Sequence, residues 1–367
     1  MSVATAGQIS RGPTNSILTV AVMLPSTSCN DNSHTFNCRP EDGHTMDAIV
    51  LAGGYATRLW PITLDRPKMF LPLGEETIID PIFESLEADE RVDDVYISTN
   101  ERFADEFETY LTESGYEKPT LSIEETTDED EKFGVISALA QLVERENLSD
   151  DTIIVAGDNY LSFGVNDFID SFRDHDAPMI AAYDVGSREK ATSYGVIDVD
   201  DDQVVGFTEK PDNPSSSLVS IACYGFPAES IDLLETYLEE GNNPDEPGWF
   251  IQWLHERTAT YAFTFDGAWF DIGTADSYLD AIEFMLDGEP YVADSATTEN
   301  VTLDAGVQIL EDATVQNADL SRTVVFPKAS VTDCTLSETL VDRHASVSGV
   351  SLTESTVGAY STLEGAD

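Results

Sequence analysis

The sequence has few basic residues and no long apolar run. Lysine and arginine together number 18 against 70 aspartates and glutamates, which gives a formal net charge of −52 over 367 residues. A surface this negative repels nucleic acid and anionic membranes. No stretch reaches the roughly 18 consecutive apolar residues that a membrane-spanning helix needs. We therefore expect neither a nucleic-acid partner nor a membrane partner.

Cysteine is also sparse, and its placement excludes two classes of protein. The four cysteines are Cys29, Cys38, Cys223 and Cys334, and none of their spacings fits a zinc site or a disulfide scaffold. We expect reduced thiols and a cytoplasmic protein. Hydrophobic residues still make up 41% of the chain, so a substantial core is expected, and the length favours two domains.

Residues 1–45 differ in composition from the rest of the chain. They hold three acidic residues, Asp31, Glu41 and Asp42, against 67 in the remaining 322 residues. Met46 stands immediately before the first predicted strand. We interpret residues 1–45 as a disordered extension or as the product of an upstream start that is not the natural one.

A glycine turn organises the first part of the chain. The apolar run Ala48–Leu51 leads into Gly53 and Gly54, which predicts a buried strand and then a turn whose backbone can approach a ligand closely. Backbone N–H groups in such a turn can bind anions. Arg58 and Lys68 follow, and both side chains suit phosphate. The pattern predicts a binding site for a polyphosphate.

The complete run resembles a family signature. Residues 51–61, read as LAGGYATRLWP, and residues 67–72, read as PKMFLP, are similar to the motifs of the sugar-phosphate nucleotidyltransferases. The resemblance implies that the nucleotide lies against Leu51, Ala52, Gly53, Gly54, Thr57 and Arg58, and that Arg58 and Lys68 act in catalysis. Ala56 replaces the family's third glycine; the loop keeps its path if φ is negative there and must shift if φ is positive.

Two aspartates stand in further family motifs. Asp158 follows the apolar run 153–156 within Gly157-Asp158-Asn159, and Asp271 lies in the run 269–274, WFDIGT. The resemblance implies that both bind Mg²⁺, with Asp158 also counted as catalytic. Mg²⁺ takes one or two carboxylates and fills its other positions with water and phosphate oxygens, which agrees with a site of two aspartates.

Further residues are expected to contact the nucleotide base and the sugar phosphate, and those at the base depart from the family motif. Gly134 resembles a family glycine that contacts the base, but the preceding family glutamine corresponds here to Glu124 or Glu125, and Met69 replaces the glutamine of thymidylyl enzymes. For the sugar phosphate, the resemblance implies Gly195, Glu209 and Lys210. A Glu-Lys pair is usually a solvated surface pair, yet only six lysines occur in the chain, which favours a function for Lys210.

The tail has an internal period of sixteen residues. Three sets of apolar residues recur at this spacing: Leu320, Leu336 and Leu352; Ile309, Val325, Val341 and Val357; and Val315, Val331, Val347 and Leu363. Three inward positions per turn predict a three-sided parallel β-helix. The tail resembles the left-handed β-helix carried by many nucleotidyltransferases, here as four 16-residue coils.

These observations together predict an α/β protein with a Rossmann-like mixed sheet over residues 46–290 and a left-handed parallel β-helix over 297–367. The resemblance implies transfer of a nucleotidyl group from an NTP to a sugar 1-phosphate, with dTTP or UTP and a hexose such as glucose 1-phosphate favoured. Alternatives are a mannose-1-phosphate guanylyltransferase and a non-catalytic regulatory subunit of the same fold. We also expect a homo-oligomer, since an open strand edge at the end of the coils invites pairing.

The charge imbalance generates a prediction about salt. In dilute buffer the acidic groups repel one another and destabilise the compact state, whereas at about 1 M salt the screening length falls to about 3 Å. We expect the midpoint of thermal unfolding to rise strongly between dilute buffer and molar KCl. Equal midpoints in the two solutions would contradict this prediction.

Overall fold

The computed structural model describes residues 45–124 and 134–366. The expectations for residues 1–44 and for Glu125 lie outside these ranges. The core of the described chain is a nine-stranded sheet. Its strands, in spatial order, are β5 (Pro119–Glu124), β4 (Val92–Asn100), β1 (Met46–Leu51), β6 (Thr152–Ala156), β11 (Leu218–Phe226), β8 (Met179–Asp184), β12 (Tyr261–Thr264), β10 (Gln203–Glu209) and β9 (Gly195–Asp200).

The sheet is mixed, as the sequence predicts. Strands β5, β4, β1 and β6 are parallel, whereas β11 runs antiparallel to both of its neighbours, β6 and β8. At one edge of the sheet, β9 and β10 form an antiparallel hairpin. Asp201 has a φ of 54° in its turn, a left-handed conformation that aspartate tolerates better than most residues.

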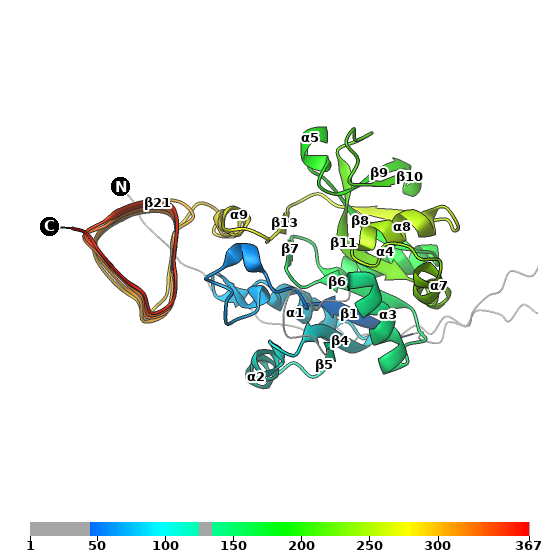
Figure 1. The fold of residues 1–367 in the computed structure, drawn as a ribbon, viewed down its shortest axis with the longest axis horizontal. Helices are drawn as coiled ribbons and strands as arrows, with labels where there is room; N and C mark the ends of the chain where they lie inside the picture. Colours follow the sequence, from blue (N-terminus) through cyan, green and yellow to red (C-terminus); the bar gives the residue numbers. More distant parts are fainter. Residues whose placement is uncertain (1–44, 125–133, 367) are drawn as a thin grey trace, which may run out of the picture. The chain divides into compact units, whose positions relative to one another are not determined.

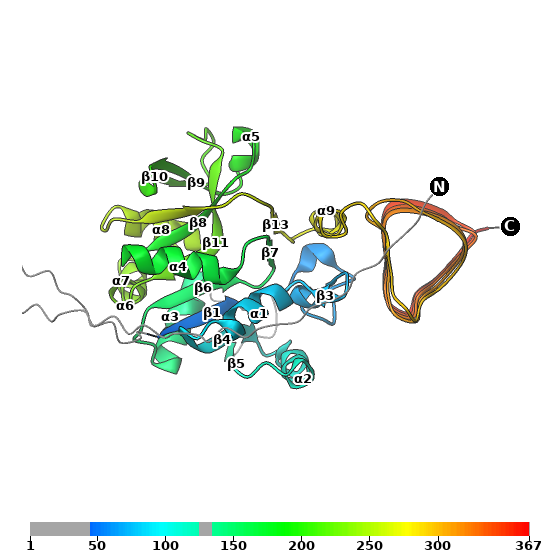
Figure 2. The ribbon, with the colours of Figure 1, turned by 180° about the vertical axis from the view of Figure 1, so that it is seen from behind.

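Helices cover both faces of the sheet, because side chains along each strand alternate between the faces. In β1, Ala48 and Val50 pack in one core with α1 (Asp80–Ala88), α2 (Ala104–Ser114) and α4 (Val165–His175). Ile49 packs in the other core with α3 (Val135–Glu146), α7 (Leu233–Glu239) and α8 (Pro247–His255). Figures 1 and 2 show the two groups of helices on opposite sides of the strands.

The strand order creates a crevice at one edge of the sheet. From β1 the chain continues through β4 and β5 on one side and then returns to β6 on the other. Ligands of open α/β sheets bind at the carboxyl ends of strands where the order reverses in this way. Gly53 follows the end of β1 and Asp158 follows the end of β6, and the Gly157 amide donates to the Leu51 carbonyl at 2.9 Å.

Ala56 has a φ of 50°, which is the positive value for which we expect a shifted loop. A non-glycine residue in this region carries strain of about 1 kcal/mol or more. The Thr63 hydroxyl donates to the Ala56 carbonyl at 2.8 Å and helps to hold the turn. Two short 3₁₀ turns follow, η1 (Thr57–Leu59) and η2 (Lys68–Phe70).

A two-stranded ribbon stands beside the crevice. Strand β7 (Asn159–Leu161) pairs antiparallel with β13 (Trp269–Asp271), and Asn159 lies opposite Asp271. Helix α9 (Ala275–Met285) begins directly after the ribbon with a capping box, in which the Thr274 hydroxyl accepts from the Ser277 amide. The ribbon therefore joins two segments that are more than a hundred residues apart in the sequence.

The C-terminal strands form one all-parallel sheet wound as a three-sided stacked coil (Figure 1). The predicted 16-residue step is confirmed by the register, which pairs Leu320 with Leu336 and Leu336 with Leu352. An earlier step is 17 residues, since Leu303 pairs with Leu320. The strands are β14 (Tyr291–Val292), β15 (Thr297–Leu303), β16 (Gln308–Ile309), β17 (Thr314–Val325), β18 (Ser330–Thr332), β19 (Thr335–Val341), β20 (Ser346–Ser348), β21 (Ser351–Val357) and β22 (Thr362–Glu364).

Residues with a left-handed backbone conformation form the corners of the stacked coil. One corner repeats every sixteen residues with φ values of 56° at Asp312, 63° at Lys328, 57° at His344 and 60° at Tyr360. Between corners, the recurring apolar side chains fill the interior. The tail can therefore turn sharply without a glycine at each corner.

A buried ion pair joins the coil to the segment after the glycine turn. Asp342 is fully buried, and Arg66 binds its carboxylate while stacking over the Phe326 ring at 4.6 Å. Apolar residues of that segment, of α9 and of the outer face of the coil pack together around this contact. Removing one partner of a buried pair is strongly destabilising, so this contact ties the two regions together.

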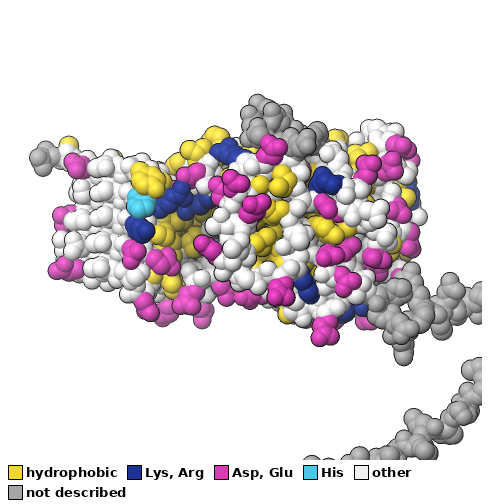
Figure 3. Space-filling model, turned by 90° about the horizontal axis from the view of Figure 1, so that it is seen from below, with side chains coloured by type: hydrophobic (Ala, Val, Ile, Leu, Met, Phe, Trp, Pro, Cys, Tyr) yellow, Lys and Arg dark blue, Asp and Glu magenta, His cyan; other side chains and the backbone are white. Residues whose placement is uncertain are grey.

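Acidic side chains are spread over the face of the molecule drawn in Figure 3, and lysine and arginine are few there. This distribution agrees with the composition. Among the described residues, none of the helices has the length and apolar content required to cross a membrane.

Candidate active site

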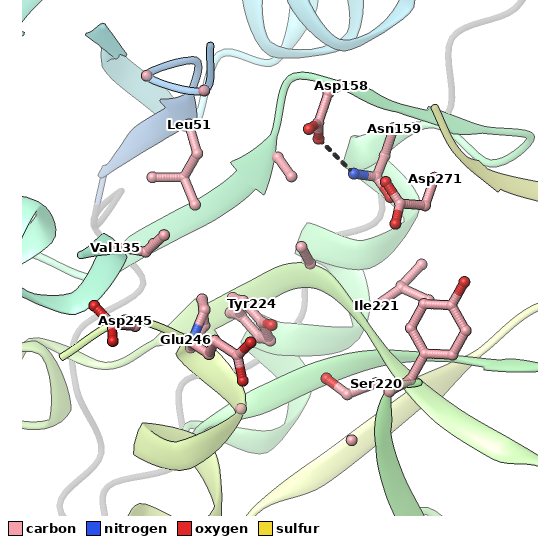
Figure 4. Close-up of a pocket in the computed structure, with 18 of the residues that line it drawn as sticks. Leu51, Val135, Asp158, Asn159, Ser220, Ile221, Tyr224, Asp245, Glu246 and Asp271 are labelled. Atoms are coloured by element: carbon pink, nitrogen blue, oxygen red, sulfur yellow. Dashed lines mark hydrogen bonds between the residues drawn. The ribbon is translucent and has the colours of Figure 1, made fainter. Parts of the chain in front are cut away.

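The crevice opens into a cavity of about 720 Å³. Its walls come from the glycine turn, β5, the segment after β6, the β9–β10 hairpin, β11, the start of α8 and β13 (Figure 4). The structure brings ten of the predicted site residues to this cavity. They are Leu51, Gly53, Gly54, Glu124, Gly134, Asp158, Gly195, Glu209, Lys210 and Asp271.

Four predicted residues do not line the cavity. The Ala52 side chain is buried in the core, whereas Thr57 and Arg58 are exposed on the turn after the glycines. Lys68 does not line the cavity itself, but its Nζ forms an ion pair with the carboxylate of Asp158, which does. Arg58 and Lys68 are both close enough to Asp271 to act on its charge.

The β7–β13 ribbon places the two aspartates next to each other. The Ile272 amide donates to the Asp158 carbonyl at 3.2 Å, and Asn159 pairs with Asp271 across the ladder. The Asn159 side-chain amide also donates to the Asp158 carboxylate at 2.8 Å. Figure 4 shows Asp158, Asn159 and Asp271 grouped at one end of the cavity.

The electrostatics of this group favour a bound cation. The Asp271 carboxylate is open to solvent in the cleft but is otherwise surrounded by protein. This burial and the neighbouring Asp158 raise the pKa of Asp271, while Lys68 and Arg58 lower it. Two carboxylates so close repel each other, and a hard cation between them would relieve the repulsion.

Asp158 and Asp271 are therefore the residues that could hold Mg²⁺. Their oxygens are the ligand type that Mg²⁺ prefers, and two protein carboxylates leave its other positions for phosphate and water. No cluster of three or more metal-ligating side chains occurs within residues 45–124 and 134–366. This donor set thus fits a metal ion that binds together with a phosphate-bearing ligand rather than a closed structural site.

The glycine turn is fixed by side chains from β4. The Asn100 side chain donates to the Gly53 carbonyl at 3.0 Å, and Ser98 donates to the Glu124 carboxylate at 3.2 Å. A Cβ on Gly53 would lie 3.4 Å from Glu124 Oε1, so the carboxylate rests against the turn. Burial raises the pKa of Glu124.

Gly134 is required by close packing at the start of α3. Its φ is 85°, and a Cβ there would lie 2.6 Å from the Pro244 carbonyl oxygen. The same carbonyl accepts from the Ile136 amide at 2.9 Å. Any side chain at residue 134 would therefore displace the start of α3 from the wall of the cavity.

Glu209, the last residue of β10, is buried and lines the cavity. It pairs with Gly195 across the β9–β10 ladder, and a Cβ on Gly195 would lie 2.8 Å from its Oε2. A Cβ on Gly248 would lie only 1.7 Å from the same oxygen. The carboxylate occupies space left by two missing side chains, and its burial raises the pKa of Glu209 to about 7.

Lys210 is more accessible than its neighbour. Its ammonium group forms an ion pair with Glu246, and the two side chains are 43% and 39% exposed. A pair this exposed contributes about 0.2–1 kcal/mol. The Lys210 ammonium can therefore exchange Glu246 for an anionic ligand at little cost.

Several cavity residues were not predicted as site residues. Asn159 lies within the same Gly-Asp-Asn motif as Asp158, and the Trp269 indole donates to its side-chain oxygen. Asn159 and Trp269 each stand in a motif that also contains a predicted metal ligand, so the sequence could have indicated them. Glu246 and Gly248 reach the cavity through the packing of α8 against β10, and no local pattern marks them.

Comparisons with known proteins show which family the chain resembles. The nucleotidyl transferase family model matches residues 47–288. A protein from Sulfolobus acidocaldarius named for mannose-1-phosphate guanyltransferase activity is 29% identical over 234 residues, which cover 64% of this chain and 61% of that protein. The low-salt glycan biosynthesis nucleotidyltransferase Agl11 of Haloferax volcanii is 25% identical, with 73% of this chain and 74% of that protein covered.

Solved structures share the fold. A crystal structure of a glucose-1-phosphate thymidylyltransferase from Bacillus anthracis, in complex with sucrose, superposes with a TM-score of 0.57 at 22% identity and covers 67% of this chain and 97% of that chain. The chain spans about three fifths of the length of the Sulfolobus relative and of several others. Because the family model covers most of the chain, the protein belongs to the nucleotidyl transferase family.

Proposed function

We propose that this protein transfers a nucleotidyl group from an NTP to a sugar 1-phosphate and releases pyrophosphate. The observation that carries the proposal is one cavity lined by the glycine turn, by Asp158 and Asp271, and by Glu209 and Lys210, with Lys68 in an ion pair with Asp158. The backbone amides of the turn and the two lysines suit phosphate groups, the two aspartates suit a metal ion, and Glu209 suits hydroxyl groups. A reaction between two phosphate esters needs both substrates held together in this way.

The chemistry requires no nucleophile from the protein. An oxygen of the sugar phosphate attacks the α-phosphorus of the NTP, a P–O bond forms to the sugar phosphate, and the bond to pyrophosphate breaks. Lys210 would bind the attacking phosphate, Lys68 the phosphates near the reacting centre and Arg58 the departing pyrophosphate. Asp158 and Asp271 would hold Mg²⁺, which when bound neutralises phosphate charge.

Glu209 suits the recognition of sugar hydroxyls. Its carboxylate is buried beside Gly195 and Gly248, where it can accept hydrogen bonds from a ligand in the cavity. Keeping it there costs folding free energy, because burial opposes its ionised form. A costly buried acid in a cavity is typical of a binding residue.

On the family resemblance, dTTP or UTP with a hexose 1-phosphate such as glucose 1-phosphate is the first candidate pair of substrates. A mannose-1-phosphate guanylyltransferase is the second candidate, supported by the name of the Sulfolobus relative. We also propose a left-handed winding for the stacked coil, a preference for high salt and a homo-oligomer. A pyrophosphate-release assay across several NTPs and hexose 1-phosphates, in molar KCl with Mg²⁺, separates an enzyme from a regulatory subunit.

The two aspartates generate the first prediction about activity. We expect Asp158→Asn and Asp271→Asn each to lower the Mg²⁺-dependent rate by about a hundredfold or more, because each removes a charge that holds the metal and its phosphates. The assay is pyrophosphate release, with circular dichroism to verify the fold. The control is Asp276→Asn, an exposed aspartate in the first turn of α9. Near-normal rates in either site variant would disprove the metal assignment.

Glu209 generates a prediction about stability and pH. Its pKa is about 7 in the folded protein and, in the unfolded chain, near the ordinary glutamate value of 4.5. Between these values the folded state binds the proton more tightly, so Glu209 lowers the free energy of unfolding as pH rises through this window. Glu209→Gln removes this effect. When the pH is raised from 5.5 to 8.5, we expect the free energy of unfolding of the variant to increase by about 2 kcal/mol relative to that of the wild type.

The measurement is denaturant unfolding in molar KCl at both pH values. Glu235→Gln, which changes an exposed glutamate on α7, provides the control and should show no such gain. If the free energies of unfolding of Glu209→Gln and wild type differ by the same amount at both pH values, the pKa of Glu209 is not raised in the folded protein.

A further inference from the structure

Glu124 is placed to contact a ligand at the glycine-turn end of the cavity. It is the last residue of β5, its side chain lines the cavity, and its Oε1 lies against Gly53. The Ser98 hydroxyl donates to that oxygen at 3.2 Å. In the described chain, this is the one hydrogen bond to the Glu124 carboxylate, which leaves acceptor capacity unused.

The surroundings of Glu124 suit a flat apolar group. Leu51, Met69, Val135 and Ala138 line the same cavity. Figure 4 shows Leu51 and Val135 on a wall away from Asp271. Lys210 is the one cation among the described residues that line the cavity, and it is paired with Glu246. Arg145 also acts on the charge of Glu124, but it is paired with Ser122 and Glu146 and does not line the cavity. Asp245 lines the cavity near Val135 (Figure 4). A ligand that approaches Glu124 therefore meets apolar side chains and carboxylates that can accept hydrogen bonds.

A nucleotide base is the part of an NTP that fits such a place, and the five common bases differ in what they offer a carboxylate. Guanine presents two neighbouring donors, N1–H and the N2 amino group, which match the two carboxylate oxygens. Uracil and thymine present one donor, N3–H, between two carbonyl oxygens. Adenine and cytosine present an amino group beside a ring nitrogen that is an acceptor.

A carboxylate can accept hydrogen bonds but cannot donate them while it is ionised. Against guanine it forms two charge-assisted bonds at once. Against every other base it forms one bond and faces at least one acceptor lone pair, which it repels. Met69 lines the cavity and offers no donor to the carbonyl oxygens of a pyrimidine.

We propose that Glu124 selects guanine, so that GTP is the nucleotidyl donor of this protein. The inference rests on the proposed function and replaces its preference for dTTP or UTP. Glu124 acts in specificity rather than in the chemical step, because it lies against the glycine turn and apart from the aspartate pair.

The test compares five nucleotides on the full chain. With GTP, UTP, dTTP, ATP and CTP, each paired with mannose 1-phosphate and with glucose 1-phosphate, we expect kcat/KM to be highest for GTP by about 10- to 100-fold. Glu124→Gln exchanges one acceptor for a donor and should lower the ratio of GTP to UTP by a similar factor. Glu101→Gln, an exposed glutamate just after β4, is the matched control and should leave the ratio unchanged.

A binding measurement separates this inference from the proposed function. Calorimetric titration with GDP and UDP should show tighter binding of GDP to wild type and a smaller difference for Glu124→Gln. Turnover that is equal or faster with UTP or dTTP would overturn the guanine assignment and leave the proposed function intact. An unchanged nucleotide ratio in Glu124→Gln would overturn the role of Glu124. Absence of turnover with every pair would overturn both.

Discussion

The repulsion between two neighbouring carboxylates is the constraint on which this site depends. Asp158 and Asp271 are held side by side by the β7–β13 ribbon, and in a chain with a net charge of −52 there are few cations to offset them. Lys68 and Arg58 are placed beside the pair, and Lys68 binds Asp158 directly. Two carboxylates and two cations leave this group without a formal net charge, so we propose that a metal ion binds here together with phosphate groups rather than alone.

Other positions around the cavity also lower the stability of the fold. Glu209 can be buried because residues 195 and 248 are glycines, and the burial raises its pKa, which means that the ionised carboxylate destabilises the folded state. Gly134 similarly lets the start of α3 approach Pro244. At each of these positions the fold gives up side-chain packing and some stability to place a polar group or a backbone at the cavity wall. Strain at Ala56 is a further cost next to the glycine turn.

Local patterns were sufficient to predict much of this arrangement. Asp158 stands directly after a strand and Asp271 within one, and their motifs mark both strands. In the tail, residues sixteen positions apart in the sequence pair in neighbouring coils, so the repeat itself predicts the strand register. The 17-residue step from Leu303 to Leu320 was missed, because the apolar repeat is irregular there. Gly248 was missed because its contact with Glu209 arises from the packing of α8 against β10 and depends on residues 39 positions apart.

The central claim is that one metal ion and the phosphates of an NTP meet between Asp158 and Asp271. The most direct measurement is anomalous diffraction from crystals of the full chain grown with Mn²⁺ and a non-hydrolysable NTP. The account predicts a single strong peak within coordination distance of both carboxylates, with triphosphate density between it and the Gly53–Gly54 turn. A peak elsewhere, or a bound nucleotide with no metal between these two aspartates, would contradict the account.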